Sequence, residues 1–261
     1  MKRLLEYLLP LLVALVLLGL WEWTVAAKGI PPYVLPAPSA IFTALVENWS
    51  GLAAAMAATL FITLKGFLGA FIAALALAIL FSQSRLAEDA LYPYAVILQV
   101  TPVVAIAPLI LIWVGFERID LALALIAGMI AFFPILSNAV QGLKSADFNL
   151  LDLARLYGAS RWQVLYRVQI PSALPALLTG MKVGGVIALI GEVTAEFVAG
   201  SGTATGLAWR IVESGNRLEI PTLFAALALL GVTGVAIFAG LSLLEWLLLR
   251  RWHESAAKQE S

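Results

Sequence analysis

The chain has 261 residues, of which 62% are hydrophobic and 12% charged, and its mean hydropathy is +0.98. A soluble protein carries roughly 25% charged residues, so the composition indicates a polytopic membrane protein. The net charge of zero implies no bulk attraction to nucleic acid, and the absence of cysteine excludes disulfides, thiolate metal sites and a cysteine nucleophile. The single histidine, His253, lies in the C-terminal tail and is predicted to be solvated.

Six stretches are long and apolar enough to cross a bilayer, which takes roughly 20 residues of helix. The first follows Lys2 and Arg3 but has no clean cleavage site after it, so we interpret it as an uncleaved span. We predict an all-α polytopic membrane protein, a single transmembrane domain over residues 1–261. Its six transmembrane helices are expected at residues 8–27, 60–81, 91–116, 119–143, 176–199 and 222–249.

The distribution of Lys and Arg predicts the orientation of these spans, because cytoplasmic loops are enriched in both residues. With the N-terminus inside, eleven of the sixteen fall on the cytoplasmic side. They are Lys2, Arg3, Arg85, Lys144, Arg155, Arg161, Arg167, Lys182, Arg250, Arg251 and Lys258. Both termini and the loop 144–175 are therefore predicted to be cytoplasmic.

Two short helices are expected outside the spans. One begins at Pro38, since proline favours the first turn of a helix, and either lies in the membrane interface or simply connects two spans. The other covers residues 207–214 and is followed by Gly215, a residue typical of helix ends.

Several polar residues lie inside the predicted spans. Those near the span prolines either join helices by hydrogen bonds or face a solute path. Glu192 and Glu196 are four residues apart and share one helix face, where a carboxylate is a functional candidate unless it lies in the hydrated interface. Gly180 and Gly184 allow another helix to approach closely. The candidate path residues are Gln99, Thr101, Asn138, Glu192 and Glu196.

The loop 144–175 is patterned as two helices. Asp147 is placed to cap the first helix, and Gly158 to end it. Ser160 and Gln163 have the spacing of a capping box for the second helix, which Pro171 is expected to end. A loop that only joins two spans has no need for two capped helices.

The motif Asp152-Leu153-Ala154-x3-Gly158-x9-Val168-x-Ile170-Pro171 resembles the EAA loop of bacterial ATP-binding-cassette importer permeases. The family pattern is Glu-Ala-Ala, three residues, Gly, nine residues, Ile, one residue and Leu-Pro, and every spacing agrees. The segments LPAPSAIFTAL, LQVTPVVAIAPLILIWVGF and AEFVAGSGTATGL resemble the subgroup that imports nitrate, sulfonates, taurine and vitamin precursors such as thiamine pyrimidine or riboflavin.

The resemblance implies the type I importer permease fold in a bacterial inner membrane. The chain has no Walker A motif, so a separate ATPase dimer is expected to bind ATP and Mg²⁺, and this chain is expected to bind no cofactor. The resemblance also implies an extracytoplasmic solute-binding protein and a second permease copy, most simply in a homodimer surrounded by membrane lipid. The two glutamates favour a neutral heterocyclic solute over an anion, if they face the path in charged form.

In such permeases the second helix of the loop is the coupling helix, which docks on the ATPase. The resemblance implies that Trp162 and Tyr166 are anchors, that Arg161 and Arg167 set the register, and that the first helix braces the second against the spans. The implied coupling residues are Asp152, Ala154, Gly158, Ser160, Arg161, Trp162, Leu165, Tyr166, Arg167 and Pro171.

Two other classes of protein compete with this interpretation. A proton-coupled secondary transporter would use Glu192 and Glu196 as a relay, but the chain shows no clear internal repeat and the capped loop helices would have no role. A membrane-embedded enzyme would have to rest on the same two glutamates alone.

Overall fold

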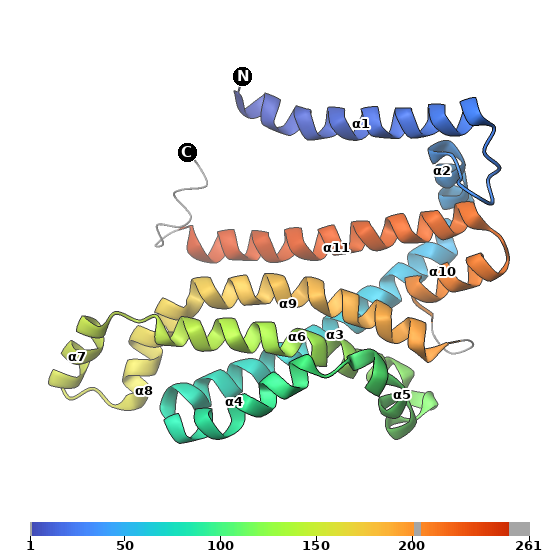
Figure 1. The fold of residues 1–261 in the computed structure, drawn as a ribbon. Coiled ribbons are helices and arrows are strands. Elements are labelled where there is room, and N and C mark those ends of the chain that lie inside the picture. Colours follow the sequence, from blue (N-terminus) through green and yellow to red (C-terminus); the bar gives the residue numbers. More distant parts are fainter. Residues whose placement is uncertain (1, 201–204, 251–261) are drawn as a thin grey trace. The chain divides into compact units, whose positions relative to one another are not determined.

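The computed structural model describes residues 2–200 and 205–250, so residue 1, residues 201–204 and the tail from residue 251, including His253, lie outside the described part. The regular elements of the described ranges are all helices, as Figure 1 shows. The chain divides into two compact units, residues 1–58 with 205–231 and residues 59–204 with 232–261. Each unit is described by itself.

The first unit is built around short helices and the ends of long ones. Glu22 accepts hydrogen bonds from the backbone nitrogen and the hydroxyl of Ser39, at 3.0 and 2.7 Å, and these bonds join α1 to α2. The helix predicted from Pro38 is confirmed, and α10 is two residues longer than predicted, since it includes Gly215. The elements are α1 (Lys2–Lys28), α2 (Pro38–Glu47), the beginning of α3 (Trp49–Gln83), α10 (Leu207–Asn216) and the beginning of α11 (Ile220–Leu249).

The second unit holds most of the long apolar helices and the loop 144–175. Two hydrophobic clusters form its interior, and both involve α3, α6 and α9. Its elements are the rest of α3, α4 (Arg85–Val100), α5 (Val103–Val114), the 3₁₀ turn η1 (Phe116–Arg118), α6 (Ile119–Lys144), α7 (Phe148–Leu156), α8 (Arg161–Val164), the π-helical segment η2 (Leu165–Gln169), α9 (Ile170–Ala199) and the rest of α11.

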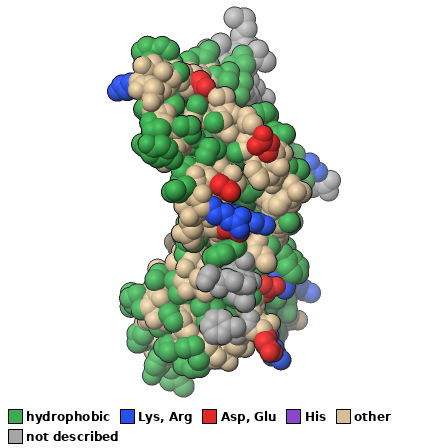
Figure 2. Space-filling view, turned by 90° about the vertical axis from the view of Figure 1, so that its right-hand side faces the viewer, with side chains coloured by type: hydrophobic (Ala, Val, Ile, Leu, Met, Phe, Trp, Pro, Cys, Tyr) green, Lys and Arg blue, Asp and Glu red, His purple; other side chains and the backbone are tan. Residues whose placement is uncertain are grey.

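Within the described residues, five helices are long and apolar enough to cross a membrane, and the pair α4 and α5 makes six if it counts as one span. Their large apolar side chains are often exposed, as Leu15 of α1 (62%) and Val235 of α11 (69%) illustrate, and Figure 2 shows such side chains over much of the visible face. This surface suits lipid and confirms the all-α polytopic membrane class.

The third predicted span, 91–116, is not one straight helix. α4 and α5 meet at an angle of 99°. Pro102 has no backbone N–H to donate and disfavours helical geometry at Thr101, whose ψ is 125°. The backbone nitrogen and the hydroxyl of Thr101 both donate to the Ile97 carbonyl, at 3.1 and 2.7 Å, so the last turn of α4 closes directly before the break. Pro93 and Pro108 remain inside their helices, so the position of a proline alone did not predict the break.

α6 and α9 pack side by side along most of their lengths (Figure 1). A Cβ atom on Gly180 would lie 2.7 Å from the Cβ of Asn138, and one on Gly184 would lie 2.5 Å from the Cγ1 of Ile135. Neither space holds a larger side chain, so the close approach predicted from these two glycines is confirmed. Asn138 lies in this contact and donates to the Pro134 carbonyl at 2.8 Å.

α3 approaches α6 through a second glycine contact. A Cβ on Gly66 would lie 2.5 Å from the carbonyl oxygen of Ala124, and a Cβ on Gly128 would lie 2.9 Å from the carbonyl oxygen of Gly66. Backbone atoms cannot swing away as a side chain can, so this contact sets the distance between the two helices.

We predict that Gly66→Val lowers the stability of the protein by about 1–3 kcal/mol, because the two helices must separate to admit the side chain. Gly69→Val is the matched control, since nothing lies within 4 Å of a Cβ at Gly69 on the same helix. Thermal unfolding of both variants in detergent measures the effect, and an equal loss at the two positions would contradict the packing argument.

Candidate functional site

The first helix of the loop 144–175 begins and ends as predicted. The side chain of Asp147 accepts a hydrogen bond from the backbone nitrogen of Asn149 at 2.8 Å. Gly158 has a φ of +71°, a left-handed conformation in which glycine is unstrained, and the Ala159 nitrogen donates to the Ala154 carbonyl at 2.9 Å across this end. The chain thus turns sharply between α7 and α8.

The second helix begins with the predicted capping box. The Gln163 nitrogen donates to the Ser160 hydroxyl at 3.3 Å, and the Ser160 nitrogen donates to the Gln163 side chain at 2.7 Å. The expectation that Pro171 ends this helix is wrong. α8 continues through η2 into α9, and residues 161–199 form one 39-residue helix. Pro171 lies in the first turn of α9, directly after a π segment that changes the hydrogen-bond register.

The loop exposes large apolar side chains that no other part of the described chain covers. α7 has no buried residue, and Phe148, Leu156 and Tyr157 are 78–85% exposed. The predicted brace between α7 and the spans is therefore not seen. On the second helix, Trp162 and Tyr166 stack with their ring centroids 6.3 Å apart and remain 59% and 65% exposed.

Leu165 differs from the other predicted coupling residues. It is fully buried and belongs to the cluster that includes Leu143 of α6 and Ala173 of α9. In this conformation its side chain cannot touch a partner, so it holds the second loop helix to the membrane-spanning part of the unit. Gln169 adds a hydrogen bond to the Leu143 carbonyl at 3.4 Å.

The remaining coupling candidates lie at the surface of the loop. Asp152 and Arg155 form an ion pair at 3.0 Å. Arg161 donates to the carbonyl of Gln83 at 3.5 Å, and Arg167 is exposed. Charged groups in such positions influence partner choice more than stability.

The candidate path residues are not brought together. Gln99 and Thr101 lie at the end of α4, and Asn138 lies in the contact between α6 and α9. Glu192 and Glu196 are buried, at 0% and 1% exposure, which places them away from the surface. A path that uses all five is not formed by this single chain.

One face of α9 lies in contact with α3 and α11 at Gly185. A Cβ at Gly185 would meet Leu241 of α11 at 2.5 Å and Phe67 of α3 at 3.8 Å. One turn farther along α9, Leu189 lies 3.4 Å from a Cβ at Gly234 of α11. Residues 185, 189, 192 and 196 share one helix face, so the same face of α9 carries both glutamates.

Other buried polar residues lie in the same unit. Thr59 and Thr63 of α3 and Thr233 of α11 are buried, as the two glutamates are. Among the described residues, both carboxylate oxygens of Glu192 lack a hydrogen-bond partner, as does the hydroxyl of Thr63. Glu192 is thus a buried carboxyl group on a membrane-spanning helix that the described part of the chain leaves without a hydrogen bond.

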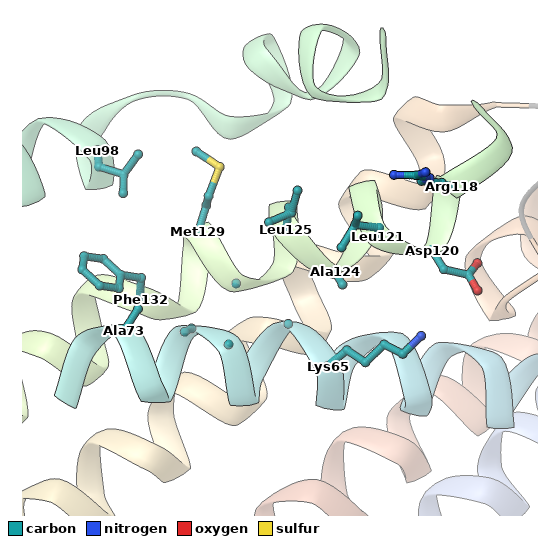
Figure 3. Close-up of a pocket in the computed structure, with 14 residues that line it drawn as sticks. Lys65, Ala73, Leu98, Arg118, Asp120, Leu121, Ala124, Leu125, Met129 and Phe132 are labelled. Atoms are coloured by element: carbon teal, nitrogen blue, oxygen red, sulfur yellow. The ribbon is translucent and has the colours of Figure 1, made fainter. Parts of the chain in front are cut away.

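A separate groove lies along α3, α4 and α6 and has a volume of about 710 Å³. Figure 3 shows Lys65, Arg118 and Asp120 at one end of it and apolar side chains, among them Leu98 and Phe132, toward the other. This groove was not predicted from the sequence. The sequence contains one indication of such a site. Lys65 is the one charged residue in the 35-residue sequence of α3, and a charge inside a span is a functional candidate.

Comparison with known proteins shows the family of the chain. The profile of the family described as "Binding-protein-dependent transport system inner membrane component" matches residues 65–252. The chain belongs to this family. It is a transmembrane permease subunit of an ATP-binding-cassette importer.

Three relatives match this permease over most of its length. The riboflavin transport system permease protein of Chloroflexus aurantiacus is 36% identical over 92% of this chain and 88% of its own. The formylaminopyrimidine transport permease protein of Halalkalibacterium halodurans is 31% identical over 95% and 98%. The taurine transport system permease protein of Escherichia coli is 31% identical over 91% and 87%.

An ion pair that was not predicted joins α9 to α11 in the permease. Lys182 and Glu245 form a hydrogen-bonded salt bridge, and each side chain is only 20% exposed. Desolvated charges of this kind depend strongly on each other, because removal of one leaves the other unpaired.

We predict that Lys182→Met or Glu245→Met alone destabilises the permease by about 1–3 kcal/mol, and that the double variant loses less than the sum. In the double variant both charges are gone, so no unpaired charge remains in the partly buried site. A double-mutant cycle on thermal unfolding in detergent gives the coupling energy. Strictly additive effects would contradict the pairing.

Proposed function

We propose that this permease couples to a separate ATPase dimer through the surface formed by Trp162, Tyr166 and the exposed apolar residues of α7. The supporting observation is the exposure of this surface on a loop that is otherwise firmly capped and anchored. Burying one large apolar side chain is worth about 1.5–3 kcal/mol, so an uncovered cluster of them favours a partner protein. ATP and Mg²⁺ would then bind to that partner.

The continuous helix from residue 161 to residue 199 supplies a direct mechanical link. A displacement of Trp162 at the loop moves the same helix that carries the buried Glu192, because no flexible linker separates them. The buried Leu165 and the π segment lie at the point where the helix enters the spans. π segments in helices occur frequently at functional sites.

We further propose that the solute passes along the groove beside α3 and α6, and that a second copy of the permease completes the path. The exposed apolar residues of the bent pair, such as Tyr94 (69%), Val100 (72%) and Trp113 (77%), offer a surface for that copy or for lipid. Gln99 and Thr101 lie at this bend, which supports their place on the path. The family and the Lys and Arg distribution favour a bacterial inner membrane with both termini in the cytoplasm.

The solute we favour is a small uncharged ring compound of the riboflavin or pyrimidine type. The groove walls are mainly glycine, alanine and larger apolar residues, which suit a flat apolar ring. Two relatives are described as riboflavin and formylaminopyrimidine permeases. A small sulfonate is the second candidate, because Lys65 and Arg118 lie at the end of the groove and another relative is described as a taurine permease.

We predict that Trp162→Ala reduces recovery of the ATPase with the purified permease at least tenfold, which corresponds to the roughly 1.4 kcal/mol or more that an interface anchor provides. Trp23→Ala is the matched control, since Trp23 is similarly exposed, at 68%, but lies on α1. Both variants should insert and melt as the wild type does. Normal ATPase recovery with Trp162→Ala would overturn the docking surface.

The transport reaction itself is tested in proteoliposomes that hold the permease and its ATPase, with the solute-binding protein outside. Uptake of a flavin or aminopyrimidine is expected to require ATP, to stop when the Walker lysine of the ATPase is replaced, and to survive a proton uncoupler. Uptake of taurine in place of the ring compounds would select the second candidate, and uptake that follows the proton gradient would refute the importer mechanism.

A further inference from the structure

A second pocket, of about 640 Å³, lies at the cytoplasmic end of the second unit, between the turn that joins α3 to α4 and the loop helices α7 and α8. Three arginines line it, Arg85 from the turn, Arg155 from α7 and Arg161 from α8, and no acidic residue does. Ser84 and Gln169 add polar groups to its wall. We call this the basic pocket.

The positive charge of the basic pocket is poorly neutralised by the chain itself. Only Arg155 has an ion-pair partner, Asp152, and both of these side chains are about 70% exposed. Among the described residues, neither Arg85 nor Arg161 has an acidic group within ion-pair distance. Glu88, which lies one turn into α4, is paired with Lys144.

The backbone at the start of α4 adds to the positive electrostatic potential of the basic pocket. α4 is a 16-residue helix that begins at Arg85, and its cap Ser84 lines the pocket and accepts from the Ala87 nitrogen at 3.2 Å. The positive end of this helix dipole therefore lies at the same place as the three guanidinium groups. Guanidinium groups and a helix N-terminus are the donors that phosphate anions prefer.

The surroundings indicate where such an anion comes from. The pocket lies where the long apolar helix α3 ends, and Leu86, directly beside Arg85, is 81% exposed. A basic cavity beside an exposed apolar side chain at a helix end matches a molecule with an anionic head and an apolar tail. Basic clusters on the cytoplasmic side of spans attract anionic headgroups by about 1 kcal/mol per residue.

We propose that the basic pocket binds a phosphate-bearing anion, with the headgroup of an anionic lipid of the cytoplasmic leaflet as its source. Bound there, the phosphate bridges Arg85 on the α3–α4 turn to Arg155 and Arg161 on the loop. It thereby ties α7, which has no buried residue, to the membrane-spanning helices. The site uses the cytoplasmic placement of the loop but is independent of the solute and of the ATPase.

The test compares lipid retention by the full-length permease in native mass spectrometry, with phosphatidylglycerol and phosphatidylcholine of equal chain length. Arg85→Gln is expected to lower retention of phosphatidylglycerol about fivefold and to leave phosphatidylcholine unchanged. Arg250→Gln is the matched control, because Arg250 is an exposed arginine predicted to lie at the same membrane face and it is not in the pocket. Arg85→Lys should keep most of the retention.

A parallel arm titrates inorganic phosphate into the delipidated permease and measures binding by calorimetry. Binding that depends on Arg85, without any preference for phosphatidylglycerol, would support the anion site and assign it to a free phosphate. Equal retention by Arg85→Gln and Arg250→Gln, with no phosphate binding, would overturn the proposal. So would a loss of ATPase recovery in Arg85→Gln with unchanged lipid retention, since the arginines would then contact the ATPase. The docking prediction for Trp162 can fail or hold without changing these lipid results.

Discussion

Helices α6 and α9 approach each other closely because Gly180 and Gly184 face Asn138 and Ile135 across their contact. In a membrane there is little hydrophobic driving force between helices, so close packing of small residues must supply much of the attraction. The other features of the second unit depend on this contact. It holds α9 against α6. Helix α9 runs from the loop 144–175 to the two glutamates, and α6 also forms one wall of the groove that Lys65 lines.

The loop 144–175 combines rigid ends with an uncovered surface. Its caps at Asp147, Gly158 and Ser160 fix the backbone, and Leu165 anchors it in the core. The exposed aromatic and apolar side chains would be unfavourable in an isolated soluble domain. They agree with the proposal that a partner subunit covers them and that the 39-residue helix carries movement into the spans.

The charged side chains within the apolar helices have three different kinds of surroundings. Lys182 is paired with Glu245 of another helix, whereas Lys65 lies at the mouth of the groove, above the ring of Phe61 at 4.1 Å. Glu192 is enclosed, and its carboxyl group has no hydrogen-bond partner. The last arrangement is costly, because a buried carboxyl group without a partner has lost its hydrogen bonds to water.

The sequence by itself determined the membrane class, the loop with its caps at Asp147 and Ser160, and the family resemblance, because these depend on composition and on spacings of a few residues. It also predicted the close approach at Gly180 and Gly184. Only the tertiary structure decided that the third span bends at Thr101, that Leu165 is buried, that α8 continues past Pro171, and that Lys65 and Arg118 meet at one groove. These features depend on which faces of distant helices meet, and hydropathy along the chain carries no information about that pairing.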